Sequence, residues 1–266
     1  MDLPYWSPSQ VKAMLECEGY FQAKYIHGLT ETGRSEKLVV GRVIDDVLSS
    51  LVNDYLTSEF RETGDWLPLH DLSIVEAHLA SELAAAETEG ETWPFQSKWL
   101  GSTMALKILQ TIDIYMRDVE GTRWEMAQRE LSCDVFGIPF KGFLDAAYTN
   151  DNGELVIIDW KSKSRRDNLD FMHRIQLSCY AWAMNTQLVE AHYIVPWTKE
   201  PGVIIHKTTR LPREIIEPYL SRRAELLGGS TPVLNPSSWR CGKACPAIHT
   251  CIVGQWKAAD VTSYAA

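Results

Sequence analysis

Residues 142–163 read GFLDAAYTNDNGELVIIDWKSK, and this stretch decides the fold. Two apolar runs each end in an aspartate, Asp145 and Asp159, and the run Asn150-Asp-Asn-Gly153 between them is typical of a tight turn. The simplest structure is a β-hairpin. Since side chains alternate along a strand, Asp159 and Lys161 share one face, and the hairpin can bring Asp145 to that face.

Two carboxylates and a lysine around one point suit a divalent metal ion. Mg²⁺ and Mn²⁺ prefer oxygen ligands, and a bound ion lowers the pKa of its water ligand. The alternative is a hairpin with solvated charges, which is common on half-exposed sheets. The apolar run at 155–158 does not alternate, however, and indicates a strand buried on both faces. An acid and a lysine at the end of such a strand are costly unless paired or bound to metal, which favours a functional site.

The composition is that of a globular protein. Hydrophobic residues make up 45% of the 266 residues and charged residues 23%. No apolar run approaches the roughly 20 residues that a membrane span needs. The N-terminus, MDLPYWSPSQ, has neither a basic start nor an apolar core, so we expect no signal peptide. We therefore expect a cytoplasmic protein that has no membrane partner.

The charge is unevenly distributed. The net charge of −9 argues against a protein that coats nucleic acid non-specifically. Residues 1–125 hold 10 Lys+Arg against 21 Asp+Glu, a balance of −11, whereas residues 126–266 hold 16 against 14, a balance of +2. A small basic cluster at 161–166 lies beside the hairpin. It is either a solvated loop or a loop that contacts nucleic-acid phosphates.

Helical periodicity dominates the first half of the chain, and strands dominate the second. Ser7 and Pro8 have the chemistry of an N-cap and a first helical position. The predicted helices are 8–26, 38–56, 72–89, 97–120, 168–185 and 212–227. The predicted strands are 126–135, 138–148, 154–160, 190–197 and 202–209. This order predicts an α/β protein, 1–266, with a mainly helical lobe (1–123), an α/β core (124–228) and a cysteine-bearing tail (229–266).

Two of the six cysteines, Cys133 and Cys179, lie inside a predicted strand and a predicted helix, and we expect them to be small core residues. The other four are a tail triplet and one distant residue. The triplet is Cys241, Cys245 and Cys251, within eleven residues.

A cytoplasmic setting disfavours disulfides and favours a metal at the triplet. Three thiolates leave one tetrahedral position for either His249 or Cys17. With His249 the site is a local zinc knuckle. With Cys17 it is a four-cysteine site that suits zinc or an iron–sulfur cluster and staples the two ends of the chain together. The remaining alternative is four reduced, unliganded cysteines.

Taken together, these residues resemble the RecB-like branch of the PD-(D/E)xK nucleases, including iron–sulfur members such as the AddB nuclease domain and the CRISPR-adaptation exonucleases. Gly142-Phe-Leu-Asp145 resembles the G-x-x-D motif of the family, and Asp159-Trp-Lys161 resembles its (D/E)-x-K motif. Gln176-Leu-Ser-Cys-Tyr180 resembles the Q-x-x-x-Y motif, whose two named residues share a helical face. The resemblance spans roughly residues 6–251.

The resemblance implies a restriction-endonuclease-like core, a central mixed sheet flanked by helices, with an N-terminal helical lobe and a cysteine-rich C-terminal tail. It also implies DNA hydrolysis with Mg²⁺ or Mn²⁺. Lys161 would orient water or stabilise developing charge, Glu130 would hold a water or the lysine, and Gln176 and Tyr180 would orient Lys161 or the DNA. The implied catalytic residues are Glu130, Asp145, Asp159, Lys161, Gln176 and Tyr180. The implied metal ligands are Asp45, Asp145, Asp159 and the carbonyl of Trp160. The implied ligands of a 4Fe–4S cluster, or of structural zinc, are Cys17, Cys241, Cys245 and Cys251.

Two stretches depart from the family pattern. The family usually has G-x-x-x-H in a helix, whereas this chain has Gly41-Arg-Val-Ile-Asp45, with aspartate in place of the histidine. Asp45 can still bind a hard metal ion, or it can mark weakened catalysis. In the tail, three residues separate Cys241 from Cys245, where two are more common.

Three functional hypotheses follow. The first is an exonuclease that prefers single-stranded or end-bearing DNA in recombination, repair or CRISPR adaptation. A helicase or recombination partner fits it, because the sequence has no P-loop. The second is a nuclease fold of weakened activity that serves as a DNA-binding or assembly subunit. The third is a zinc-stapled protein whose hairpin charges are incidental.

Overall fold

The computed structural model divides the chain into two compact units. The first unit comprises Met1–Gly33, Ser132–Gly142 and Leu211–Ala266, and the second comprises Arg34–Leu131 and Phe143–Arg210. The residues that the structure describes are 3–29, 36–57, 75–78, 80–81, 102–165, 167–238, 241, 245–247 and 250–251.

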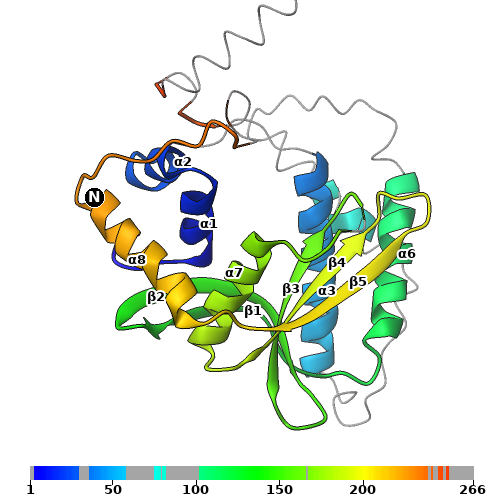
Figure 1. Cartoon of the computed structure of the whole chain (residues 1–266). Helices are drawn as coiled ribbons and strands as arrows, with labels where there is room; N and C mark the ends of the chain where they lie inside the picture. Colours follow the sequence, from blue (N-terminus) through cyan, green and yellow to red (C-terminus); the bar gives the residue numbers. More distant parts are fainter. Residues whose placement is uncertain are drawn as a thin grey trace, which may run out of the picture. The chain divides into compact units, whose positions relative to one another are not determined.

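A five-stranded mixed sheet is the framework of the fold (Figure 1). Its strands lie in the order β1-β2-β3-β4-β5. β3 pairs antiparallel with β2 and parallel with β4, and β4 pairs antiparallel with β5. The parallel pair needs a crossover, which α7 provides. The strands are β1 (Arg123–Val135), β2 (Ile138–Thr149), β3 (Leu155–Ser162), β4 (Leu188–Val195) and β5 (Gly202–Thr209).

The predicted hairpin is the β2–β3 pair. Ala146 lies opposite Ile158, and Thr149 lies opposite Leu155. Between the strands, the side-chain oxygen of Asn150 accepts hydrogen bonds from the backbone N–H groups of Asn152 and Glu154. Gly153 has a φ of +78°, a conformation that glycine adopts without steric cost. The turn chemistry therefore sets the register of the two strands that carry the aspartates.

Helices cover both faces of the sheet in the second unit. α3 (Glu36–Thr57) and α6 (Ser102–Asp118) enclose the main apolar core with one face of the sheet, to which Ile158 and Trp160 belong. α7 (Phe171–Ala183) packs on β3 and β4, and its Gln176 contacts Asp159, which points to the opposite face. This arrangement confirms the predicted α/β core with a mixed sheet and flanking helices.

The helix expected at 38–56 is found as α3. Of the helix expected at 97–120, residues 102–118 are helical as α6, and residues 97–101 lie outside the described residues. Of the helix expected at 72–89, residues 75–78, 80 and 81 are described and are helical, and the rest lies outside the described residues.

The first unit contains the N-terminal helices and α8 (Arg213–Leu227). The prediction of one continuous helix over 8–26 is wrong. α1 (Pro8–Glu16) ends at Cys17, whose backbone is extended with φ −172° and ψ 124°, and α2 (Glu18–Phe21) and a π-helical turn (Gln22–Ile26) follow. The side chain of Asn235 donates to the carbonyl of Glu16 at 2.8 Å, so the segment after α8 satisfies a carbonyl at the end of α1.

An ion pair from α8 and a hydrogen bond from the segment after it join them to the N-terminal helices. Arg222 lies 2.7 Å from the carboxylate of Glu18, and the backbone N–H of Val233 donates to the same carboxylate at 2.6 Å. The prediction that Cys133 is a core residue is wrong, because its side chain is exposed on β1, whereas Cys179 is buried as expected. No helix among the described residues is both long and apolar enough to cross a membrane.

Candidate active site

Asp159 and Lys161 lie at the end of β3 and form a close ion pair. Asp159 is 1% exposed, and Nζ of Lys161 lies 2.6 Å from its Oδ2. Burial alone would lower the pKa of Lys161, but the charges of Asp159, Asp145 and Asp45 raise it above its usual value. The lysine is therefore an ammonium ion, held at the strand end by the carboxylates around it.

Asp145 reaches the same point from β2. Its Oδ2 accepts a hydrogen bond from the backbone N–H of Trp160 at 2.9 Å and lies 3.7 Å from Nζ of Lys161. Lys161 also donates to the carbonyl of Trp160 at 2.9 Å. Burial raises the pKa of Asp145 to about 7; Lys161 opposes this rise, and the charge of Asp159 adds to it. The hairpin thus brings two carboxylates and one ammonium group together.

Asp45 approaches this group from α3. Burial raises the pKa of Asp45 to about 8, and the neighbouring charge of Asp145 adds to the rise. Its Oδ1 is buried and accepts no hydrogen bond from any described residue. A buried carboxylate oxygen without a donor is costly unless it takes a proton or meets a cation. The departure from the family pattern therefore places an acid at this site.

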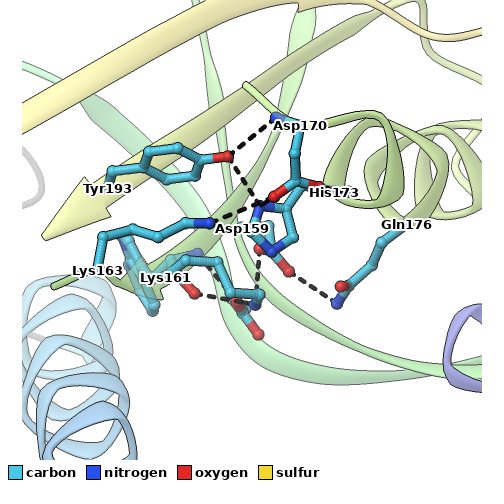
Figure 2. Close-up of polar contacts among 9 residues, drawn as sticks. Asp159, Lys161, Lys163, Asp170, His173, Gln176 and Tyr193 are labelled. Atoms are coloured by element: carbon cyan, nitrogen blue, oxygen red, sulfur yellow. Dashed lines mark hydrogen bonds and ion pairs between the residues drawn. The ribbon is translucent and has the colours of Figure 1, made fainter. Parts of the chain in front are cut away.

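Two polar residues of α7 complete the group, and Figure 2 shows one of them, Gln176. The side-chain amide of Gln176 donates to Oδ1 of Asp159 at 2.9 Å. Burial raises the pKa of Tyr180, and the charges of Asp159 and Asp145 act in the same direction. Glu130 differs from these residues, because it lies on β1 with an exposed side chain.

Several polar residues near the site escaped the sequence analysis. Asp170, His173 and Tyr193 form a hydrogen-bonded group next to Asp159, and Lys163 pairs with Asp170 at 3.3 Å (Figure 2). A separate chain of contacts runs from the indole N–H of Trp160 to the hydroxyl of Tyr115, at 2.8 Å. The one sequence signal for His173 is its spacing of three residues before Gln176, which places the two on one helical face.

Comparison with protein families identifies the fold that carries this site. The model of the PD-(D/E)XK nuclease superfamily matches residues 5–252, nearly the whole chain. The chain belongs to the PD-(D/E)XK nuclease superfamily. Superfamily membership agrees with the acid and lysine at the end of β3, since its name describes that motif.

Other comparisons add less to the superfamily assignment. Twenty-one chains of solved structures match. One, titled "Crystal structure of SSO0001", shares 17% sequence identity with a TM-score of 0.41, over 81% of this chain and 95% of the other. A likeness at this level carries no argument about activity. No curated protein matches the chain.

The carboxylates of this superfamily member suit a hard cation only with additional ligands. Among the described residues, no group of three or more His, Cys, Asp or Glu side chains is arranged to hold a metal ion. Mg²⁺ characteristically uses one or two protein carboxylates and completes its octahedron with waters and substrate phosphate oxygens. Asp145 and Asp159, with the unpartnered Oδ1 of Asp45 nearby, match that partial set.

The first unit holds a second candidate site, a cavity lined by four thiols. Cys17, Cys241, Cys245 and Cys251 all line it, together with Gly19 and Leu234. The extended backbone at Cys17 precedes Gly19, where an added Cβ would lie 2.6 Å from Leu234 and 3.6 Å from the sulfur of Cys17. The cysteines form no disulfides. His249, the alternative ligand, lies outside the described residues.

Proposed function

We propose that this protein is a Mg²⁺- or Mn²⁺-dependent deoxyribonuclease that degrades DNA from its ends and prefers single strands. The observation that carries the proposal is the meeting of Asp145, Asp159 and Lys161 at the end of β3. Nζ of Lys161 lies 2.6 Å from the carboxylate of Asp159 and 3.7 Å from that of Asp145. The superfamily match supports phosphodiester hydrolysis as the reaction class.

Each residue of the group has a role in this proposal. Asp145, Asp159 and the carbonyl of Trp160 would hold the metal ion, and Asp45 would add a ligand. The ion supplies a water of lowered pKa and neutralises charge on the scissile phosphate. Lys161, fixed by Asp159 and the carbonyl of Trp160, would stabilise the negative charge that develops as water adds to phosphorus and the P–O bond breaks.

Gln176 would keep Asp159 in the orientation that faces the metal, since its amide holds the other carboxylate oxygen at 2.9 Å. Tyr180 would orient Gln176 or the DNA from the same face of α7. Glu130 would hold a water or the lysine, a role for which its exposed position on β1 gives the least support.

We further propose that the chain is of the RecB-like type and that Cys17, Cys241, Cys245 and Cys251 bind a structural 4Fe–4S cluster, or zinc in its place. The shared cavity supports this, because the four thiols come from both ends of the chain. The backbone N–H of Asn235 lies 3.4 Å from the sulfur of Cys17, and hydrogen bonds to sulfur are typical of ligated thiolates.

A second candidate function is a DNA-binding or assembly subunit of weakened activity. Asp45, at the place where the family usually has histidine, favours it. In both functions the protein would work with a helicase or recombination partner in recombination, repair or CRISPR adaptation.

Cleavage of end-labelled single- and double-stranded DNA with Mn²⁺ separates the two candidates. The variants are Asp159→Ala and Lys161→Ala, and the matched control is Asp151→Asn in the exposed β2–β3 turn. If the protein is a nuclease, the wild type and the Asp151→Asn variant degrade the DNA, and the Asp159→Ala and Lys161→Ala variants do not. If anaerobically prepared wild type binds DNA without cutting it, the subunit function holds instead.

A further inference from the structure

His173 extends the polar face of α7 toward the strand that carries the acid and the lysine. It lies three residues before Gln176 and seven before Tyr180, so all three side chains share one face of the helix. Gln176 fixes that face against β3 through its 2.9 Å hydrogen bond to Asp159. His173 therefore lies about one helical turn from Gln176, the residue that contacts the proposed catalytic carboxylate.

The ring of His173 is rigidly held on one side. Asp170 caps α7 by accepting from the backbone N–H of His173 at 2.8 Å, and its other oxygen lies 3.0 Å from Nδ1 of the ring. The hydroxyl of Tyr193 lies 2.8 Å from the same Nδ1. The side chain is 8% exposed. Three contacts thus fix the ring through its backbone and its Nδ1.

The other ring nitrogen, Nε2, has no hydrogen-bond partner among the residues that the structure describes. In Figure 2 the ring lies on the side of α7 that faces Asp159. The negative charge of Asp159 acts on the ring and opposes the lowering of the His173 pKa by burial. A ring anchored through Nδ1 beside a carboxylate leaves Nε2 as the atom that can meet a substrate.

A lysine, Lys163, lies beside the residues that anchor the ring. Nζ of Lys163 lies 3.3 Å from Asp170 and 4.6 Å from the centre of the Tyr193 ring. Farther along the chain, Arg165 lies 2.8 Å from Asp167, and His206 contacts the carbonyl of Asp167. Lys163 is therefore the basic group held beside the ring, by Asp170 and by the face of Tyr193.

We propose that His173 is a substrate-contacting residue that donates from Nε2 to a backbone phosphate of the DNA bound at Asp145 and Asp159, with Lys163 contacting the same strand. This inference rests on the proposed function. Asp170 acts as a positioning residue, because its carboxylate accepts from Nδ1–H and, together with the DNA phosphate, holds the ring as the imidazolium, which also donates from Nε2. Phosphate contacts of this kind set the register of a strand without reading its sequence.

Two substitutions of His173 test the roles of the two ring nitrogens one at a time. Asparagine places its amide close to the position of Nδ1, so His173→Asn retains the contact with Asp170 and loses Nε2. Glutamine places its amide close to Nε2, so His173→Gln retains the outward donor and loses the anchor. DNA binding by each variant is measured by fluorescence anisotropy with a labelled single-stranded oligonucleotide in EDTA, over a range of salt concentrations. Thermal melting checks that each variant is folded.

We expect His173→Asn to weaken binding about tenfold and His173→Gln to bind within about threefold of wild type. Both variants should also reduce the slope of log K against log salt by about 0.7, because neither amide carries the imidazolium charge. The inference is overturned if His173→Asn binds as wild type does or retains its salt slope. It is also overturned if both variants weaken binding equally, because the anchoring of the ring is then responsible.

The outcomes remain distinguishable from failure of the proposed function. A wild-type protein that binds the oligonucleotide in EDTA but does not cleave it with Mn²⁺ overturns the nuclease activity alone, and the comparison of variants still decides the role of His173. A wild-type protein that binds no DNA overturns both.

Discussion

Replacing Lys161 with methionine tests whether this ammonium group holds the carboxylates of the site together. The side chain is 25% exposed, and its Nζ lies 2.6 Å from Asp159 and 3.7 Å from Asp145. At an effective dielectric constant of about 20, these distances correspond to Coulomb attractions of about 6 and about 4 kcal/mol. Most of this attraction offsets the cost of removing the charges from water. Removing one partner of a buried pair typically costs about 3–5 kcal/mol, because the other charge stays buried.

We therefore expect Lys161→Met to lower the free energy of unfolding by about 3 kcal/mol at pH 8.5, and the melting temperature by roughly 6–12 °C. The loss should be smaller at pH 5.5. Uncompensated carboxyl groups bind protons in the folded variant at pH values where the unfolded chain has released them. Stability then falls as the pH rises from about 4 through the raised pKa values.

The measurement is urea denaturation with EDTA at both pH values. Lys199→Met, an exposed lysine in the β4–β5 turn, is the matched control and should change stability by less than about 0.5 kcal/mol. A loss below about 1 kcal/mol for Lys161→Met at pH 8.5 would refute the reasoning, as would an equal loss at both pH values. Either result would mean that the carboxylates do not depend on Lys161 for compensation.

Three further predictions concern the metal, the ion pair of the first unit and the thiol cavity. Mn²⁺ should raise the melting temperature more at pH 8.5 than at pH 6. The pKa values of Asp145 and Asp45 are raised to about 7 and about 8, so both carboxyl groups must release protons to bind the ion. Equal shifts of the melting temperature at the two pH values would contradict this. Arg222→Ala should destabilise the protein at pH 7 and do so less at pH 3, because the Arg222 hydrogen bond lowers the pKa of Glu18 and this contribution is lost as Glu18 becomes protonated. Urea denaturation at both pH values measures the effect, and a loss of stability that is independent of pH would exclude this pair as the cause. Cys17→Ser should at least halve the iron or zinc content found by elemental analysis. Cys133→Ser, at an exposed cysteine, is the control and should leave the metal content unchanged. An unchanged metal content in both variants would remove Cys17 from the proposed site.

The hairpin was predictable because its determinants are local. Asn150 and Gly153 have the side-chain acceptor and the positive φ that the turn needs, and the unbroken apolar run before Asp159 indicates burial on both faces. Strand alternation then places Asp159 and Lys161 on one face. The sequence therefore predicts that the two strands pair and that their charged residues share a face. The distances among the three charged groups depend on the surrounding packing, which the sequence does not reveal.

The break at Cys17 shows why other features were not predictable. Residues 8–26 have helical periodicity, yet the chain leaves the helix where Asn235, more than two hundred residues away, contacts both Glu16 and Cys17. Tertiary contacts here override local preference. His173 escaped for a related reason, because its significance arises from Asp170 and Tyr193, which no short motif connects to it.

Trp160, the middle residue of the acid–x–lysine motif, links the two faces of β3. Its backbone N–H and carbonyl contact Asp145 and Lys161, while its indole N–H donates to Tyr115 on the opposite face at 2.8 Å. The Tyr115 hydroxyl lies 2.8 Å from Nδ1 of His192, whose Nε2 lies 2.8 Å from the buried Glu190. Each of these polar groups is buried and paired, and an unpaired one would cost about 1–3 kcal/mol, so the indole has a single favourable orientation. Because the same residue carries the main-chain atoms that orient the acid and the lysine, the core behind the sheet helps to determine the geometry of the site in front of it.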